Sequence, residues 1–285
     1  MTEPAPAGPG AAGTAASPVL MFDSGIGGLT VMRALVAHLP NEEFIYLGDT
    51  ARLPYGTKSG DTVTRYALQA AAALMKRKVK MLVVACNTAS AVALPALQEM
   101  FAPVPVVGVI VPGAEAAVTA APEGPIAVIA TEGTVKGGAY VRAIEDHGRS
   151  IPVIQQACSL FVAIAEEGLV EGDIAEAIAR RYIEPLLAAV PKPKALVLGC
   201  THFPALKNTI AKVAGPDIRL VDSAETTAKA VEKILREKNL KRGSAAKPSH
   251  IFLATDAPDR FARVGEIFLG QPIDPGRVEL VDLQT

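Results

Sequence analysis

Short runs of aliphatic residues alternate with longer amphipathic segments along almost all of this 285-residue chain. Short apolar runs bounded by Gly, Pro or polar residues are typical of strands in a parallel sheet that helices cover on both faces. We predict such strands at 19–22, 44–47, 81–85, 106–109, 126–130, 153–156, 195–198 and 218–221. The segments between them predict helices at 30–39, 62–77, 90–100, 136–147, 173–189, 204–213, 226–237 and 258–269. The fold class is therefore α/β.

The order of motifs in the first half of the chain recurs in the second half. One predicted strand ends at Asp23, the next begins near Phe44, and a later one ends at Cys86. The corresponding positions in the second half are, in the same order, Thr131, Pro152 and Cys200. This repeat predicts two pseudo-symmetric, doubly wound domains. Because ligands bind beyond the carboxyl ends of parallel strands, we expect the active site in the cleft between them.

Charge restricts the class of partner. The chain has 28 Lys and Arg residues against 29 Asp and Glu residues, a formal net charge of −1. This balance disfavours nucleic acid and membrane surfaces and leaves a small molecule as the expected ligand. The apolar stretch 101–114 contains prolines and is too short to cross a bilayer, so we expect no membrane span.

Cysteine usage and the N-terminal segment indicate the compartment. Three cysteines in a chain of this length do not make a disulfide framework, so we expect free thiols and a cytoplasmic location. The N-terminus lacks the basic and apolar regions of a secretory signal. Its residues 1–17, rich in Pro, Ala and Gly, are predicted to form a disordered tail.

Two of the cysteines occupy matching positions in the two halves. Cys86 and Cys200 each stand between a strand and a helix, where the helix N-terminus stabilises a thiolate. A thiol there could act as a nucleophile, a metal ligand or a general acid/base. Because Cys200 and His202 do not have the spacing of a zinc motif, we expect no metal site. Cys158 is predicted to be a small buried side chain without a chemical role.

Polar residues surround these positions. Asp23 precedes a glycine-rich loop, 24–28, whose backbone N–H groups could bind an anion, although a tight turn needing glycine for steric reasons is an equal alternative. The segment 48–56 ends in a turn that presents the Tyr55 hydroxyl, and a purely structural turn is an alternative there too. His202 lies close enough to Cys200 to tune its protonation.

Two opposed thiols suit stereoinversion at a carbon. One group must remove a proton from one face of the carbon while the other delivers a proton to the opposite face. The reverse reaction exchanges the two roles, which accounts for a duplicated site. No flavin or nicotinamide fingerprint is present, and a pyridoxal lysine cannot be recognised from sequence. An amino-acid binding module and a one-cysteine hydrolase or transferase are the alternatives, but both leave the second thiol unexplained.

Four ordered segments resemble the glutamate racemases of the aspartate/glutamate racemase family. They are DSGIGG at 23–28, GD with PYG within 48–56, ACNTAS at 85–90 and GCTHFP at 199–204. The resemblance runs from about residue 18 to about residue 270. It implies cofactor-independent racemisation of L-glutamate to D-glutamate for peptidoglycan synthesis, by a protein that is commonly a homodimer. Racemisation of aspartate or another amino acid by the same scheme is the alternative.

The resemblance also implies roles for residues. Cys86, assisted by Asp23, would exchange the proton with D-glutamate, and Cys200, assisted by His202, with L-glutamate. Glu166 matches the auxiliary carboxylate of the family, although Ser159 and Ala163 stand where the family usually has prolines. The positions that match substrate-binding or substrate-adjacent residues are Asp23, Ser24, Tyr55, Gly56, Asn87, Thr88, Thr131, Thr134, Thr201 and His202.

The family fold further implies that the C-terminal segment returns to the first domain. The expected division is a first domain of 18–112 with 226–285 and a second domain of 113–225. Arg52 is the only Arg or Lys in the motifs, so we expect neutral donors and helix N-termini to hold the substrate carboxylates.

Overall fold

The computed structural model describes residues 13–75, 77–148, 150–243 and 248–283. Residues 13–17 form a turn in which the Gly13 N–H donates to Val79 O (3.0 Å) and Ala15 O accepts from Lys80 Nζ (2.8 Å). The disordered tail predicted for 1–17 is therefore wrong for this turn. The remainder of that tail, 1–12, lies outside the described residues.

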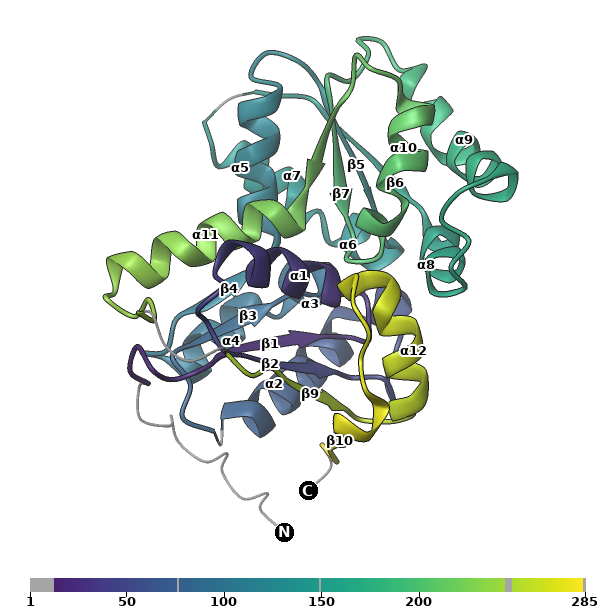
Figure 1. Ribbon diagram of the computed structural model, residues 1–285. Helices are drawn as coiled ribbons and strands as arrows, with labels where there is room; N and C mark the ends of the chain where they lie inside the picture. The colour runs from purple at the N-terminus through teal and green to yellow at the C-terminus, as the bar shows by residue number, and fades with distance from the viewer. Residues whose placement is uncertain (1–12, 76, 149, 244–247, 284–285) are drawn as a thin grey trace.

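Two parallel sheets form the two lobes of the molecule (Figure 1). The first sheet has the order β10-β9-β2-β1-β3-β4, with β1 at Val19–Asp23, β2 at Phe44–Gly48, β3 at Met81–Val84, β4 at Val106–Gly108, β9 at Ile251–Ala254 and β10 at Val278–Leu280. The second has the order β6-β5-β7-β8, with β5 at Ile126–Ala130, β6 at Val153–Ala157, β7 at Ala195–Gly199 and β8 at Arg219–Asp222. All paired strands run parallel. The predicted α/β class is confirmed.

The repeat in the sequence appears again in the strand order. In the first lobe β2-β1-β3-β4 places the second strand beside the first, followed by the third and fourth. In the second lobe β6-β5-β7-β8 has the same order. The thiol loops come after the third strand of each set, β3 and β7, so the two halves place them at equivalent edges.

Helices cover both faces of each sheet (Figure 1). They are α1 at Leu29–His38, α2 at Gly60–Met75, α3 at Asn87–Val92, α4 at Leu94–Phe101, α5 at Ile110–Ala120, α6 at Glu132–Gly137, α7 at Ala139–Glu145, α8 at Ser159–Glu166, α9 at Asp173–Leu187, α10 at Lys207–Ala214, α11 at Ser223–Glu237 and α12 at Pro258–Leu269. Short 3-10 turns lie at Tyr55–Thr57, Phe203–Leu206 and Pro275–Arg277. The residues of β1 alternate between the two faces: Val19 and Met21 pack in one core cluster, Leu20 and Phe22 in the other.

Several helices differ from the sequence prediction for local reasons. The helix expected at 136–147 is divided into α6 and α7, because Gly138 adopts a left-handed conformation (φ +59°). The helix expected at 90–100 begins earlier, since Cys86 caps α3, and continues as α4 after a break at Ala93. Neither α5 nor α8 was predicted, because both are apolar nearly throughout and lack a helical stripe.

The C-terminal segment returns to the first sheet, where β9 pairs with β2 and β10 pairs with β9. We propose the division into 18–112 with 226–285 and 113–225 as the domain boundaries. The two crossings then fall within α5 and α11, which pack against each other.

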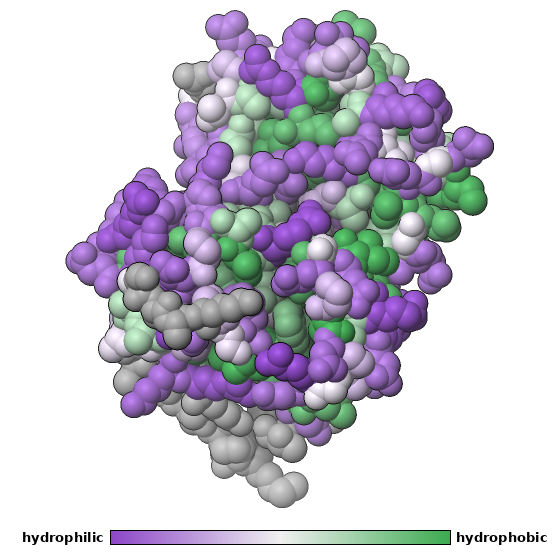
Figure 2. All heavy atoms as spheres, viewed as in Figure 1, coloured by the Kyte–Doolittle hydropathy of each residue, from purple (hydrophilic) through white to green (hydrophobic). Residues whose placement is uncertain are grey.

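The surface is mostly polar. Figure 2 shows hydrophilic residues over most of the visible face, with hydrophobic ones gathered over the region of α8 and α9. Leu160, Leu169 and Ile174 are exposed in this region. None of the described helices is long and apolar enough to cross a membrane.

Candidate active site

Cys86 occupies the turn between β3 and α3. It is the N-cap of α3, and its Sγ accepts a hydrogen bond from the Ala89 N–H (3.4 Å) and donates one to Ser24 Oγ (3.5 Å). The residue is 4% exposed. Burial, reinforced by the charge of Asp23, raises the pKa of Cys86 to about 12. Cys86 is therefore held as a thiol over the physiological pH range.

Asp23 ends β1 and lies fully buried beside this thiol. Its Oδ2 accepts from the Gly25 N–H (3.0 Å), while its Oδ1 has no hydrogen-bond partner within the described part of the chain. Burial raises the pKa of Asp23, and the charge of His202 opposes this rise. Asp23 therefore interacts with both thiol loops: with Cys86 directly, and with the loop of Cys200 through His202.

Cys200 follows β7 in the second lobe and lies at the end of a chain of polar groups. Its Sγ is 3.9 Å from His202 Nδ1, and His202 Nε2 is 3.0 Å from Glu166 Oε1. Arg260 Nη2 donates to the other Glu166 oxygen, Oε2, at 2.8 Å. Cys200 and His202 are 5% and 7% exposed, whereas the Arg260 side chain is 40% exposed. This row of polar groups therefore runs from the buried thiol to the surface.

The polar groups between Cys200 and Arg260 favour a cationic His202. Burial alone would lower its pKa, but the hydrogen bonds to Cys200 and Glu166 outweigh burial and raise the pKa of His202 to about 10. Burial likewise opposes ionisation of Glu166, yet the hydrogen bonds from His202 and Arg260 lower the pKa of Glu166 to about 2. An imidazolium donates at both ring nitrogens, so Cys200 Sγ is the acceptor of the His202 Nδ1–H.

Hydrogen bonds across the lobe boundary bring the two loops together. Asn87, next to Cys86, donates from Nδ2 to the Tyr140 hydroxyl of α7 (2.9 Å). Burial raises the pKa of Tyr140, and the nearby Cys200 sulfur adds to the rise. Tyr140 thus interacts with the loops of both cysteines. From the other side, Thr30 Oγ1 donates to Thr201 O (2.8 Å).

A cluster of hydroxyls joins the lobes beside α3 and α6. Thr88 Oγ1 shares hydrogen bonds with Thr131 Oγ1 (2.9 Å) and Thr134 Oγ1 (3.3 Å), and Thr131 with Thr134 (3.1 Å). Gly56 packs so closely on Thr131 that a Cβ atom there would lie 2.7 Å from the Thr131 Cβ. The structure therefore brings these four sequence-predicted residues together.

Tyr55 differs from the expectation that its hydroxyl faces a substrate. The hydroxyl donates to Asp49, a buried carboxylate that also accepts from Arg52 Nε (2.7 Å) and Thr255 Oγ1 (3.0 Å). The Arg52 guanidinium further donates to Gln69 and lies over the Tyr66 ring. Arg52 is thus engaged within the first lobe.

The segment that carries Glu166 forms a regular helix without the two expected prolines. Ser159 is the first residue of α8, and the Leu160 N–H donates to the Tyr182 hydroxyl (3.3 Å). Glu166 is the last residue of this helix and reaches His202. Cys158, just before the helix, is fully buried in the core, and burial raises its pKa.

The sequence did not indicate three residues of the site: Tyr46, Tyr140 and Arg260. The Tyr46 hydroxyl donates to Gly25 O (3.0 Å), and burial together with the Asp23 charge raises the pKa of Tyr46. For Tyr46, the only sequence signal is its place in the strand just before the Gly48-Asp49 pair. Tyr140 and Arg260 lie in helices, and no motif marks them.

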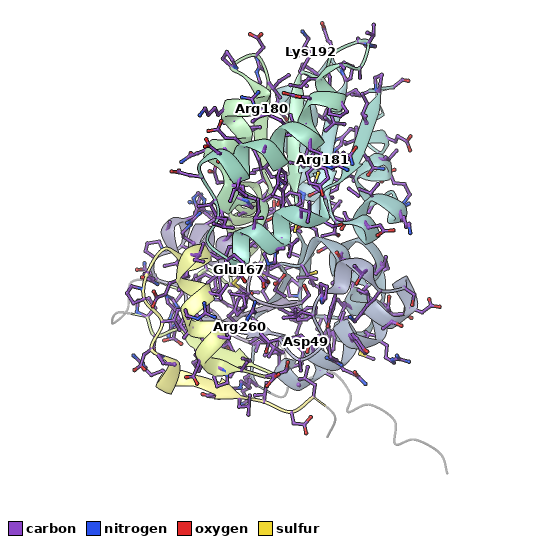
Figure 3. All side chains as sticks on the ribbon, turned by 90° about the vertical axis from the view of Figure 1, so that its right-hand side faces the viewer. Asp49, Glu167, Arg180, Arg181, Lys192 and Arg260 are labelled. Atoms are coloured by element: carbon purple, nitrogen blue, oxygen red, sulfur yellow. The ribbon has the colours of Figure 1, made fainter. Side chains whose placement is uncertain are left out.

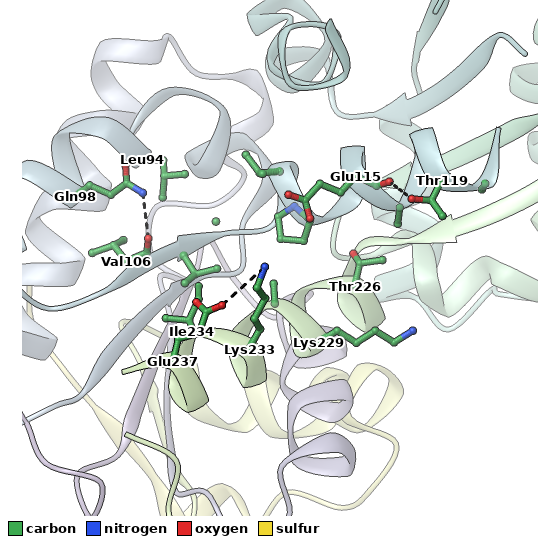
Figure 4. Close-up of a pocket in the computed structure, with 17 residues that line it drawn as sticks. Leu94, Gln98, Val106, Glu115, Thr119, Thr226, Lys229, Lys233, Ile234 and Glu237 are labelled. Atoms are coloured by element: carbon green, nitrogen blue, oxygen red, sulfur yellow. Dashed lines mark hydrogen bonds and ion pairs between the residues drawn. The ribbon is translucent and has the colours of Figure 1, made fainter. Parts of the chain in front are cut away.

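A separate cleft of about 740 Å³ lies on the side of the two crossing helices (Figure 4). Val106 and Gln98 of the first lobe, Glu115 of α5, and Lys229 and Lys233 of α11 line it. None of the sequence-predicted site residues does. The described residues contain no cluster of His, Cys, Asp and Glu side chains that could hold a metal ion.

Comparison with known proteins gives consistent results. Residues 25–231 match the model of the family described as Asp/Glu/Hydantoin racemase. The chain is 49% identical to a glutamate racemase of Geobacter metallireducens, over 93% of this chain and 96% of the relative.

Solved structures agree. The fold matches the crystal structure of glutamate racemase from Francisella tularensis in complex with D-glutamate, with a TM-score of 0.87 at 38% identity, covering 95% and 99% of the two chains. It also matches a Bacillus anthracis glutamate racemase isoform, with a TM-score of 0.88 at 36% identity, covering 94% and 98%. With the family model matching most of its length and relatives this similar, the chain belongs to the Asp/Glu/Hydantoin racemase family.

Proposed function

We propose that this chain interconverts L- and D-glutamate by transferring protons at Cα between two cysteines, without a cofactor. The observation that carries the proposal is the unequal setting of two equivalent thiol loops. Cys86 is held as a thiol beside Asp23, whereas Cys200 accepts a hydrogen bond from a cationic His202. A two-base reaction needs one group ready to accept a proton and one ready to donate.

The chemistry then proceeds in two proton transfers. Cys200 Sγ accepts the α-proton of L-glutamate, so the Cα–H bond breaks, an S–H bond forms, and the electron pair stays on Cα. Cys86 then donates its thiol proton to the opposite face of the carbanion and becomes a thiolate. Starting from D-glutamate, the two cysteines exchange roles. Backbone N–H groups at the start of α3, next to Cys86, would stabilise the developing charge.

The substrate is proposed from the relatives and from the polar lining of the site. Relatives that cover nearly the whole chain are glutamate racemases, and the Francisella tularensis structure holds D-glutamate. In this chain Arg52 is paired within the first lobe. Neutral donors and helix N-termini would therefore bind the substrate carboxylates, which is compatible with release of either enantiomer. The side chains we propose for binding include Ser24, Asn87, Thr88 and Thr201.

Exchange in deuterated water tests the function. Either enantiomer of glutamate, incubated with the protein, should lose optical rotation and acquire deuterium at Cα. The measurement is polarimetry combined with proton NMR at the α position. Absence of exchange from both enantiomers would overturn the proposal, and exchange of aspartate alone would reassign the substrate.

The wider role follows from the same proposal. D-glutamate supplied by this reaction would serve peptidoglycan synthesis, and the three free cysteines suit a reducing cytoplasm.

We also propose a homodimer, for which the exposed Leu160, Leu169 and Ile174 offer apolar contact area. Light scattering in solution tests the dimer, since a monomeric mass at micromolar concentration would contradict it.

A further inference from the structure

We propose that Arg260 is a positioning residue that holds Glu166 against His202 and so prepares Cys200 for proton transfer. The inference rests on the proposed two-cysteine reaction. Arg260 lies on α12, far from the four motifs in sequence. Its guanidinium Nη2 is 2.8 Å from Glu166 Oε2, and the other oxygen of the same carboxylate is 3.0 Å from His202 Nε2. One carboxylate therefore links Arg260 to the imidazole.

The contact joins two lobes. Helix α12 packs against α1 and β10 of the first lobe, whereas Glu166 ends α8, which packs against α9 and the Phe203–Leu206 turn of the second lobe. In Figure 3 Arg260 lies on α12 just below Glu167, the residue that comes directly after α8. The ion pair therefore links the two lobes beside His202.

A second contact from α12 supports the same imidazole. The Phe268 ring meets the His202 ring edge-on, with centroids 5.0 Å apart and planes at 76°. Arg260 and Phe268 both belong to α12. Gly270, in a left-handed conformation, ends this helix immediately after Leu269. α12 thus constrains His202 directly through Phe268 and indirectly through Arg260 and Glu166.

The charges around His202 explain why Arg260 matters. Cys200 lies in its own loop, Glu166 comes from α8, and Asp23 acts on it from the end of β1. Arg260 is the cation placed on the outer oxygen of Glu166. Without it, the carboxylate would keep a single charged partner and could turn toward water, because Glu166 borders the surface with a side chain 14% exposed. The Nε2–H of His202 would then lose its fixed acceptor.

Arg260 can be replaced without damage to the core, because its side chain is 40% exposed. Arg263, on the same helix, is a matched control. It is exposed, and it forms no ion pair with any of the described residues. Arg260→Met and Arg263→Met change the charge equally. We expect kcat/KM to fall about tenfold in Arg260→Met and to stay within twofold of wild type in Arg263→Met. Because the two enantiomers have equal free energies, the equilibrium constant is one and kcat/KM has the same value in both directions. The fall in kcat/KM must therefore be the same for L- and D-glutamate.

Isotope effects separate a positioning role from general damage. If only the Cys200 transfer slows, the primary deuterium isotope effect on kcat/KM should rise with [2-²H]-L-glutamate, whose deuterium Cys200 removes. It should fall toward one with [2-²H]-D-glutamate, whose deuterium Cys86 removes in a step that no longer limits the rate. Isotope effects that stay unchanged, or that move in the same direction, would overturn the proposal.

A double-mutant cycle tests whether Arg260 acts through Glu166. In a Glu166→Gln background a neutral amide replaces the carboxylate, so Arg260→Met should have less than twofold further effect. Arg260→Lys, which keeps the charge, should restore part of the activity. Full additivity of the two substitutions would refute the pathway through Glu166. Wild-type racemisation measured alongside distinguishes these failures from a failure of the proposed function, since in the latter case wild type would be inactive too.

Discussion

Cys86→Ala and Cys200→Ala are each expected to lose glutamate racemisation by about 10³-fold or more, because each removes one of the two proton carriers. The remaining sulfur still faces only one side of Cα, so inversion cannot be completed. The measurement is the rate of change of optical rotation from each enantiomer, with thermal unfolding monitored to show that the variants remain folded.

Cys158→Ala is the matched control for both substitutions. Cys158 is fully buried and belongs to the hydrophobic core, where its Sγ lies 3.5 Å from Gln156 O. Its replacement changes the same atoms as the other two, but the hydrogen bond that Cys158 donates goes to Gln156 O and not to a residue of the proposed proton path. Racemisation should therefore survive. A Cys200→Ala protein that racemises glutamate at the wild-type rate would refute the two-base mechanism.

The single variants should also differ from each other. Cys86→Ala retains Cys200 with its cationic His202 partner, so it should still exchange the α-proton of L-glutamate with solvent without forming D-glutamate. Cys200→Ala retains a thiol whose pKa is about 12, and its exchange of D-glutamate should be far slower near neutral pH. Equal exchange rates in the two variants would contradict the unequal settings proposed for the two cysteines.

The two thiol loops can be predicted from sequence because they depend on local patterns. Apolar runs fix β3 and β7 in the chain, and the parallel arrangement places the loops after these strands at one edge of each sheet. The spacing shared by the halves then indicates that Cys86 and Cys200 are equivalent. The ends of α12 are also local, since Pro258 begins it and Gly270 ends it, and the predicted range 258–269 matches.

The remainder of the site depends on tertiary packing, which has no local signature. Arg260 reaches Glu166 across 94 residues of sequence, and Asn87 reaches Tyr140 across 53. Nothing near either pair in the chain indicates its partner. The apolar helices α5 and α8 were missed for a related reason: when a helix is apolar on nearly all sides, periodicity does not distinguish it from a strand.

Gly27→Ala is expected to lower kcat/KM for glutamate about 10²-fold, the effect expected when a catalytic group is displaced by about 1 Å. Gly27 has no positive φ, so its backbone accepts alanine. The obstacle is space, because an added Cβ would lie 2.4 Å from His202 Nδ1 and 2.6 Å from Thr201 Oγ1. Nδ1 is the atom that faces Cys200 Sγ, so the new methyl group occupies the region that the proposed proton-accepting pair requires.

The neighbours of Gly27 cannot move aside cheaply. Thr30 Oγ1 bonds both Gly27 O (3.0 Å) and Thr201 O (2.8 Å), while Glu166 and Phe268 fix the far side of the His202 ring. Gly25→Ala in the same loop is the control, since its Cβ would meet only Leu53, at 3.5 Å, and activity should stay within a few-fold of wild type. Wild-type activity in Gly27→Ala would mean that His202 can shift without cost, and the close packing of the two lobes around it would then not determine the rate.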